Sequence, residues 1–479
     1  MDREGDRVME KRDTSAGPWR GKVAVTTLGC RVNQYDSSAI EDRLTEEGFS
    51  TVPFSPAADA YIINTCTVTG RTDNQSRQLI RMARRMNPSS IVIVTGCYAQ
   101  VSPRDVAAIE GVDYILGNPE KDLAVECIKK GRPPSGPVSI VGQWQRGVPL
   151  GLRAAIPRAR TRANLKVQDG CDMACSYCAI PMARGFSKSV AHPDILREIE
   201  ALVERGFREI ILTGVHLGAY GADLSPKLTL AALVREIEKR NYPCRFRLSS
   251  LDPDEVTDEL IEILAGASSV CNHLHLPLQS GDDGILKLMR RPYTAGRFRD
   301  TVLKLHEKVR GISIGADVMA GFPGEGEEEF ANTYNLIRDL PVSYLHIFPY
   351  SRRKGTPASA YPFALDPGEI RTRCDALREL DGRKREEFYA SFLSEEMDVL
   401  VEGRRDRKTG LLKGRTRNYI PVLIEGDDGL KTREVKARLY KVTETGVAGW
   451  LAVEAGWLAV ETGRLAVETG WLAAMPGKT

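Results

Sequence analysis

Three cysteines stand close together near the middle of the chain, in the run QDGCDMACSYCAIPMARG that contains Cys171, Cys175 and Cys178. Iron-sulfur clusters take a Cys thiolate at each iron, so this C-x3-C-x2-C loop can hold three corners of a [4Fe-4S] cube. The fourth iron is then open, which a reaction needs and a structural site avoids. Zinc or buried thiols are the alternatives, but zinc would need a fourth protein ligand and no Cys or His follows Cys178 closely. The spacing therefore predicts a catalytic [4Fe-4S] cluster.

Three more cysteines, Cys30, Cys66 and Cys97, are far apart in sequence, but each ends a β-rich run: KVAVTTLGC, AYIINTC and IVIVTGC. The carboxyl ends of parallel strands meet along one edge of an open α/β sheet, where ligands bind. The three thiols can therefore converge. Spacing alone leaves a metal site and single buried cysteines equally open. The remaining cysteines have no partners in their helical or strand contexts and are expected to be buried: Cys127, Cys244, Cys271 and Cys374.

Strands and helices alternate through the two regions that carry the six grouped cysteines. The first, residues 22–135, is predicted to be a small parallel α/β domain. Its first helix is expected to open at Asp36 and Ser37, with Ile40 and Leu44 on one face, and to stop at Gly48. The Pro- and Gly-rich run GRPPSGPVS leads into a linker over residues 136–160. Residues 161–390 contain six strand-helix units, too few for a closed eight-fold barrel, so a partial (β/α)6 barrel is predicted. The loop with Cys171 falls on its C-terminal face.

The two ends of the chain differ in pattern from the middle. Short strand-like runs fill residues 391–449 and predict an OB-like β-barrel. Residues 450–479 repeat a seven-residue unit, but the Gly in every repeat disfavours a helix, so a low-complexity, poorly ordered tail is predicted. Residues 1–21 are polar and charged without periodicity, which predicts disorder.

Composition and charge fit a cytoplasmic protein. The chain has 479 residues, a net charge of +3 and ten cysteines, and cytosolic thiols are kept reduced. No signal peptide is recognisable, and no apolar run approaches the roughly 20 residues that cross a bilayer, so no membrane partner is expected. The mild net charge neither demands nor excludes nucleic acid as a partner. Residues 401–440, however, hold eleven Lys and Arg against six Asp and Glu, a local excess of +5.

The loop with Cys171, Cys175 and Cys178 resembles that of the radical S-adenosylmethionine (SAM) superfamily. The resemblance implies that the open iron chelates the amino and carboxylate groups of SAM. It also implies that Tyr177 lies beside the SAM adenine. Reductive cleavage of SAM then yields a 5′-deoxyadenosyl radical, chemistry that the cofactor supplies and the protein orients.

The runs LGCRVNQYDS, NTCTVTGRTDNQSRQ and TGCYAQ are similar to the N-terminal domain of the methylthiotransferase family. That similarity implies an auxiliary [4Fe-4S] cluster on Cys30, Cys66 and Cys97, and therefore two clusters in all. Further matches are TGVHLGAYG, HLHLPLQSGDDGILKLMRRPYT, GADVMAGFPGE and HIFPYSRRKGTPA. They imply five residues on the SAM face: Gly214, Gln279, Ser280, Asp317 and Gly321. The histidines in these runs, His273, His275 and His346, are more simply explained as core or supporting residues.

The C-terminal β-barrel looks like the TRAM module, which binds RNA, so a group of basic residues is expected to contact phosphates. These residues are Arg404, Arg405, Arg407, Lys408, Lys413, Arg415 and Arg417.

The resemblance also suggests a substrate. The sequence around Cys30 is most similar to the branch that adds a methylthio group to C2 of N6-threonylcarbamoyladenosine (t6A) at position 37 of tRNA. Arg31 and Val32 replace the Gln-Met pair of the isopentenyladenosine branch and the Pro-Lys pair of the branch that modifies a ribosomal protein aspartate. Those two branches remain as alternatives, and a tRNA-binding iron-sulfur sensor without turnover is a reading of a different class. The expected partners are the anticodon stem-loop bearing t6A, whose base can be splayed into a pocket, and a reductant such as flavodoxin or ferredoxin. No side chain is assigned as a general base.

Overall fold

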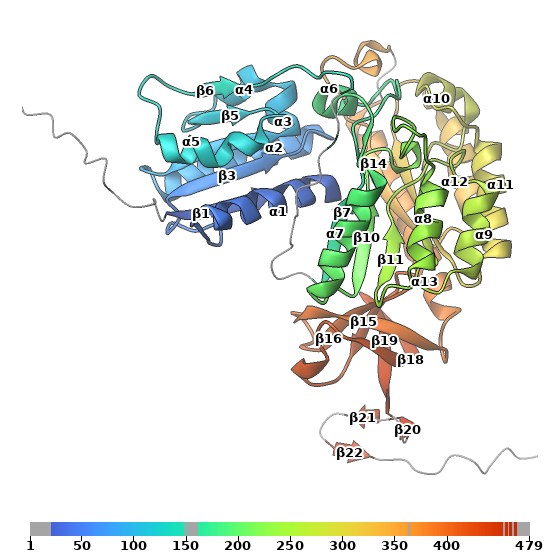
Figure 1. The fold of residues 1–479 in the computed structure, drawn as a ribbon. Coiled ribbons are helices and arrows are strands. Elements are labelled where there is room, and N and C mark those ends of the chain that lie inside the picture. Colours follow the sequence, from blue (N-terminus) through green and yellow to red (C-terminus); the bar gives the residue numbers. More distant parts are fainter. Residues whose placement is uncertain are drawn as a thin grey trace, which may run out of the picture.

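The structure is a computed structural model that describes residues 21–147, 150, 161–362, 365–453, 456–457, 459–461 and 464–466. Figure 1 shows three bodies: an N-terminal α/β domain in blue and cyan, a barrel domain from green to orange, and a C-terminal β-domain in red. The N-terminal segment predicted to be disordered lies outside the described residues except for Gly21, and so do residues 148–149 and 151–160 of the predicted linker. Among the described residues, no helix has the length and apolarity required to cross a lipid bilayer.

The N-terminal domain is built on a six-stranded parallel sheet in the order β2-β1-β3-β4-β5-β6. The strands are β1 (Lys22–Thr27), β2 (Ser50–Thr51), β3 (Ala60–Thr65), β4 (Ile91–Gly96), β5 (Tyr114–Leu116) and β6 (Val138–Ile140). The central strands β3 and β4 are buried along their whole length, because helices cover both faces. One face carries α1 (Arg31–Glu46) and α5 (Ala124–Lys130), and the other carries α2 (Gly70–Met86), α3 (Cys97–Val101) and α4 (Pro103–Ala107).

Two details of this domain differ from the sequence-based expectation. Helix α1 begins at Arg31 rather than at Asp36, because the extended residue Cys30 is its N-cap and the carbonyl of Cys30 accepts the first helical hydrogen bond from Gln34 N–H. Ile40 and Leu44 are buried as predicted, and Gly48 follows the helix with a φ of 84°. The sheet also runs past residue 135, because β6 lies within the Pro- and Gly-rich segment and pairs with β5.

The barrel domain has six parallel strands in chain order, as predicted. They form two three-stranded sheets, β7-β10-β11 and β12-β13-β14, joined by single bridges between Phe246 and Val270 and between Ser250 and His275. The strands are β7 (Arg162–Lys166), β10 (Glu209–Thr213), β11 (Arg245–Leu248), β12 (His273–Gln279), β13 (Ser313–Ala320) and β14 (Tyr344–Pro349). A short pair, β8 (Gln168–Asp169) and β9 (Lys188–Ser189), extends β7.

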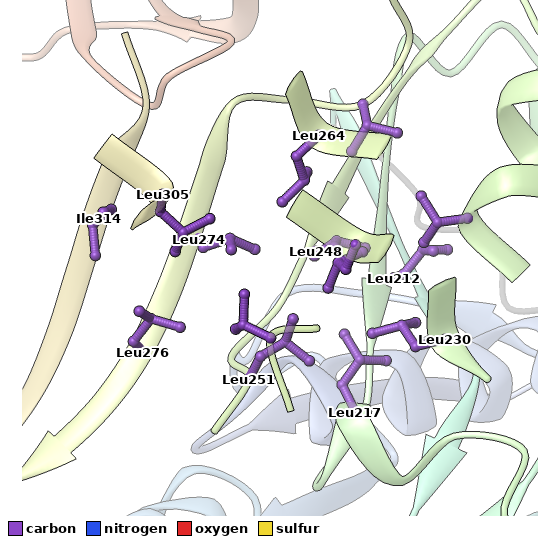
Figure 2. Packing of buried hydrophobic residues seen from close by; sticks show 14 of the residues in the cluster. Leu212, Leu217, Leu230, Leu248, Leu251, Leu264, Leu274, Leu276, Leu305 and Ile314 are labelled. Carbon is purple, nitrogen blue, oxygen red and sulfur yellow. The ribbon is translucent and has the colours of Figure 1, made fainter. Parts of the chain in front are cut away.

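Helices surround the outside of this partial barrel. They are α6 (Ile180–Arg184), α7 (His192–Glu204), α8 (Leu230–Lys239), α9 (Asp258–Gly266), α10 (Asp283–Leu288), α11 (Ala295–Lys308), α12 (Glu327–Asp339) and α13 (Pro367–Ala390). Figure 2 shows the core between strands and helices, where Leu248 and Leu274 pack with Leu264 and Leu305. Side chains alternate between the two faces of a strand. The strand residues that flank Leu248 and Leu274 therefore face the interior of the barrel, and most of them are polar.

The C-terminal domain is a β-barrel, as predicted, and the structure shows that five strands form it. Its order is β17-β16-β15-β18-β19, and a parallel pairing of β17 with β19 closes it. The strands are β15 (Glu396–Arg405), β16 (Leu412–Thr416), β17 (Pro421–Ile424), β18 (Glu434–Thr443) and β19 (Gly446–Val453). Beyond it, β20 (Gly456–Trp457) pairs with β19, and β21 (Ala459–Glu461) pairs with β22 (Arg464–Ala466); the rest of the seven-residue repeat lies outside the described residues.

The C-terminal domain packs against the N-terminal ends of the barrel strands, opposite α6 and α10 (Figure 1). Arg245 at the start of β11 pairs with Glu434 at 2.8 Å and donates to the carbonyl of Arg415. Arg247 donates to the carbonyl of Arg417, and the side chain of Arg417 donates in return to the carbonyls of Ser268 and Val270. These charge-assisted hydrogen bonds fix the orientation of the β-domain on the barrel.

Candidate active site

The three cysteines of the N-terminal domain meet at one edge of its sheet. Cys30, Cys66 and Cys97 follow β1, β3 and β4, which are neighbours in the sheet. A Cβ atom at Gly29, where φ is 93°, would come within 2.6 Å of the Cys66 sulfur, so only glycine lets the chain pass this thiol. Burial, together with the nearby Cys97 and Cys30, raises the pKa of Cys66 to about 12. The structure therefore brings together the thiols that the sequence could only suggest.

The second set of cysteines lies in the loop that follows β8. The backbone N–H groups of Met173 and Ile180 donate to the sulfurs of Cys171 and Cys178, each at 3.4 Å. Burial raises the pKa of Cys178 to about 12, with Cys175 and Cys171 adding to the rise. These thiols are mutual neighbours, and N–H groups aimed at sulfur stabilise the thiolate form that iron binds.

Both sets have the donor chemistry that an iron-sulfur cluster requires. Each offers three thiols and no fourth, since the remaining cysteines lie elsewhere. Cys127 and Cys374 belong to hydrophobic cores, Cys271 is fully buried and Cys244 packs against the barrel core. With pKa values raised to about 12, the thiols of Cys66 and Cys178 would stay protonated at neutral pH, so metal binding must displace their protons.

Two further residues, Arg291 and His216, adjoin the cysteine loop, and sequence reasoning did not single them out. Arg291 donates to the sulfur of Cys175 at 3.2 Å and also binds Asp252. His216 binds Glu255, with 2.5 Å between Nε2 and Oε1. Burial lowers the pKa of His216, but hydrogen bonds to Cys171 and Glu255 outweigh this effect and raise the pKa to about 10. Both Arg291 and His216 stand in sequence runs that carried the family resemblance, so their motifs were visible but their contacts were not.

Tyr177 packs into an aromatic cluster beside the cysteine loop. Its ring meets Phe322 edge-on, with 6.4 Å between the ring centroids, and the cluster also contains Tyr350 and Tyr361. The neighbouring Ser176 is fully buried and donates to the carbonyl of Leu288 at 2.8 Å. These contacts hold the loop against the ends of the later barrel strands.

The other residues predicted for the SAM face lie at different depths in the barrel. Gly214, Gln279 and Gly321 follow or end β10, β12 and β13 at the C-terminal face. Ser280 lies at the same level, but it is fully buried and its hydroxyl contacts Thr333 at 3.3 Å. Asp317 lies deeper, within β13. Gly214 and Gly321 also have a steric role. A Cβ atom at Gly214 would lie 2.8 Å from Gln168 Oε1, and one at Gly321 would lie 2.5 Å from the side chain of Ile370.

Asp317 is part of a hydrogen-bonded chain inside the barrel. One ring nitrogen of His275 lies 2.8 Å from Oδ1 of Asp317, and the other contacts the hydroxyl of Tyr344. The same hydroxyl lies 2.8 Å from a ring nitrogen of His273. His346 lies 3.4 Å from the same oxygen of Asp317. Burial would raise the pKa of Asp317, but His275 and His346 hold it below its usual range. His273 and His275 are buried, as expected of core histidines, whereas His346 is 53% exposed and faces the interior space.

A buried ion network connects the two cysteine sets. Asp36 in α1 accepts from Lys121 at 2.5 Å, from Lys166 in β7 at 2.6 Å and from Arg184 in α6 at 3.1 Å. Arg184 also donates to both oxygens of Asp169 at 2.9 Å and to the side chain of Asn33. These cations hold the pKa of Asp36 well below its usual range against the effect of burial. Arg184 follows Cys178 and Asn33 follows Cys30 within one or two helical turns, so the network sets the two sites relative to each other.

The basic residues predicted to bind RNA divide into two groups. Arg405 pairs with Asp428 at 2.8 Å, Arg415 donates to the carbonyl of Tyr419 at 3.3 Å, and Arg417 is held by the barrel. These three serve the protein's own structure. The others present their charge at the surface: Arg404, Arg407 and Lys408 are exposed, and Lys413 is half-buried.

Comparison with known proteins decides the family. Residues 22–117 match the family described as "Uncharacterized protein family UPF0004", and residues 165–337 match the radical SAM superfamily. Threonylcarbamoyladenosine tRNA methylthiotransferase MtaB of Bacillus subtilis is 38% identical over 423 residues, which cover 88% of this chain and 94% of that protein. The chain belongs to the methylthiotransferase family of radical SAM enzymes. It is an enzyme that uses an iron-sulfur cluster and SAM, as the sequence predicted.

Two further comparisons frame this membership. The tRNA-2-methylthio-N(6)-dimethylallyladenosine synthase of Carboxydothermus hydrogenoformans is 33% identical, over 87% of this chain and 96% of that protein. Among solved structures, the radical SAM methyltransferase TsrM of Kitasatospora setae aligns with a TM-score of 0.53 at 18% identity, covering 71% of this chain and 74% of that one. The second likeness confirms the fold class and carries no conclusion about the reaction.

Proposed function

We propose that this enzyme adds a methylthio group to C2 of N6-threonylcarbamoyladenosine at position 37 of tRNA. The observation that carries the proposal is the presence of two separate three-thiol sets, on two domains, joined by the buried ions around Asp36. Identity to the threonylcarbamoyladenosine tRNA methylthiotransferase of Bacillus subtilis is 38%, against 33% for the dimethylallyladenosine synthase, which supports this substrate.

Cys171, Cys175 and Cys178 would hold one [4Fe-4S] cluster, and Cys30, Cys66 and Cys97 a second. When bound, the first cluster supplies one-electron cleavage of SAM and the second presents the sulfur to be transferred. The chain's own residues do the rest. N–H groups and Arg291 stabilise the thiolates, Arg184 and Lys166 hold the two domains in register, and the aromatic cluster around Tyr177 packs against the loop.

The surface charges of the β-domain support binding of the anticodon stem-loop. Arg404, Arg407 and Lys408 are exposed on a domain whose orientation is fixed by its contacts with the barrel. Exposed cations on a rigid β-barrel suit sequence-independent phosphate contacts. A cytoplasmic location and a small reductant protein such as flavodoxin or ferredoxin complete the proposal.

Mass spectrometry of tRNA nucleosides tests this function in cells with and without the gene. We expect the 2-methylthio form of threonylcarbamoyladenosine to disappear on deletion and to return with the intact gene. Loss of the isopentenyl derivative instead would move the enzyme to the sister branch, and unchanged nucleosides would refute a role in tRNA. Iron and sulfide analysis of the anaerobically purified protein should give about eight of each per chain, the content of two [4Fe-4S] clusters.

A further inference from the structure

A cavity of about 470 Å³ lies where the three domains meet. Its wall includes Arg31 from α1, Arg162 from β7, and Glu402, Arg404 and Tyr419 from the C-terminal domain. A site shared by three domains exists only in the assembled protein. The cavity is lined mainly by polar and charged groups, so its natural occupant is polar.

The charges around this cavity do not balance. The carboxylate of Glu402 forms ion pairs with two arginines, at 3.0 Å from the guanidinium of Arg162 and 3.7 Å from that of Arg415. In the part of the chain that the structure describes, the side chains of Arg31 and Arg404 form no hydrogen bond and no ion pair. Arg404 is exposed to solvent, whereas Arg31 is half-buried. A half-buried guanidinium without a counter-ion marks a position where an anion is stabilised.

The charge of Arg31 acts on the interior of the barrel. Burial would raise the pKa of Tyr419, but Arg415, Arg31, Arg162 and Arg247 together lower it to about 8. Burial lowers the pKa of His273 well below its usual value, and Arg31 is among the cations that lower it further. Arg31 and Tyr419 line the same cavity, and the ring centroid of Tyr419 lies 4.6 Å from that of His273, so Arg31 stands next to the chain of polar residues inside the barrel.

We propose that Arg31 binds the carboxylate of the threonylcarbamoyl group and so selects this nucleoside over one with an uncharged N6 substituent. The inference rests on the proposed function and names the residue that reads the substrate. Arg31 directly follows Cys30, so a nucleobase held at the N-terminal cysteines lies beside the start of α1. A guanidinium pairs with a carboxylate through two parallel hydrogen bonds, which an isopentenyl group cannot make.

Synthetic anticodon stem-loops that differ at one group test the proposal. One carries threonylcarbamoyladenosine and the other its carboxamide, which keeps the shape and loses the charge. The rate of methylthio product formation per substrate concentration (kcat/KM) is measured for the wild type, Arg31→Gln and Arg31→Lys. A matched control is Arg297→Gln, an exposed arginine on α11 outside the cavity. RNA affinity is measured in parallel by fluorescence anisotropy.

We expect the wild type to prefer the carboxylate RNA by about 10- to 100-fold, the range for a hydrogen-bonded charge pair. Arg31→Gln should remove this preference by lowering kcat/KM for the carboxylate RNA only. Arg31→Lys should keep part of the preference, and Arg297→Gln should keep all of it. An equal loss on both RNAs would show that Arg31 binds a backbone phosphate and would overturn the proposal. So would a wild type that does not discriminate, a result that needs no variant. If the wild type makes no product from either RNA, the proposed function itself fails.

Discussion

The guanidinium of Arg291 lies 3.2 Å from the sulfur of Cys175 and simultaneously binds the carboxylate of Asp252. Hydrogen bonds and positive charge at cluster sulfurs raise the reduction potential of an iron-sulfur cluster, because they stabilise the added electron. Arg291 is therefore expected to set how easily the cluster of the barrel domain is reduced.

Arg291→Gln should lower the midpoint potential of that cluster and slow the formation of 5′-deoxyadenosine from SAM by about 10- to 100-fold. Potentiometric titration followed by electron paramagnetic resonance measures the first effect, and product analysis the second. Arg290→Gln, at the exposed neighbouring position, is the control and should change neither. An unchanged potential in the Arg291 variant would show that the contact only supports the loop.

The two cysteine sets should fail in different ways. Cys175→Ala should abolish cleavage of SAM, since it removes a ligand of the predicted catalytic cluster. Cys66→Ala should abolish methylthiolation but leave some cleavage, because the barrel keeps its own three thiols. Chromatography of 5′-deoxyadenosine and of nucleosides distinguishes the two outcomes, and Cys374→Ala, in a hydrophobic core, controls for loss of any thiol. Loss of cleavage in both ligand variants would refute this division of labour.

Asp36 should matter for stability far more than its single charge suggests. Asp36→Asn leaves Lys121, Lys166 and Arg184 without their shared carboxylate at a buried interface, and breaking such a pair costs about 3 kcal/mol or more. Urea unfolding should report this loss, together with separate unfolding of the N-terminal domain and the barrel. Asp194→Asn, which breaks an exposed ion pair with Arg197, should cost less than about 1 kcal/mol.

The same carboxylate predicts a dependence on pH. The pKa of Asp36 in the folded protein is well below its ordinary value of 3.8, because the surrounding cations outweigh burial. Its stabilising contribution is therefore complete above pH 4 and disappears as the pH falls through the lowered folded-state pKa. The difference in unfolding free energy between wild type and Asp36→Asn should be constant from pH 7 to about pH 4 and shrink below that. A difference that grows toward acid would contradict the assignment.

The exposed basic residues of the β-domain should carry RNA affinity without selectivity. Replacing Arg407 and Lys408 together by Gln should weaken binding of all stem-loops alike. The slope of log affinity against log salt should fall by about 1 for each phosphate that the variant no longer binds. Lys239→Gln, an exposed lysine on the outer helix α8, is the control. A change in preference between stem-loops with different nucleosides, at an unchanged salt slope, would argue against phosphate binding by these side chains.

Local sequence patterns were enough to predict the strands and the placement of the cysteines on them. Apolar β-rich runs ending in Cys30, Cys66 and Cys97 become β1, β3 and β4, because the burial that makes a strand apolar also places it at the centre of a parallel sheet. The six barrel strands and the closed C-terminal barrel follow from the same periodicity.

The contacts between distant residues could not be predicted in this way. Asp36 looked like the opening of a helix, yet it lies inside α1 and binds lysine and arginine side chains about 85 to 148 residues away in sequence. A sequence shows the same residue type whether its carboxylate caps a helix or binds a distant cation. Likewise, Arg405, Arg415 and Arg417 fitted a basic RNA-binding surface, but hydrogen bonds within the protein occupy them.

The buried ions around Asp36 also limit how this protein can be recombined. An N-terminal domain grafted onto another barrel would carry Asp36 and Lys121 into a new interface, while Lys166, Asp169 and Arg184 stayed behind. The graft would then enclose charges that lack their counterparts, a defect that good packing elsewhere cannot repair. A working chimera would therefore have to exchange the N-terminal domain and the barrel domain together, so that every buried charge keeps its counter-ion.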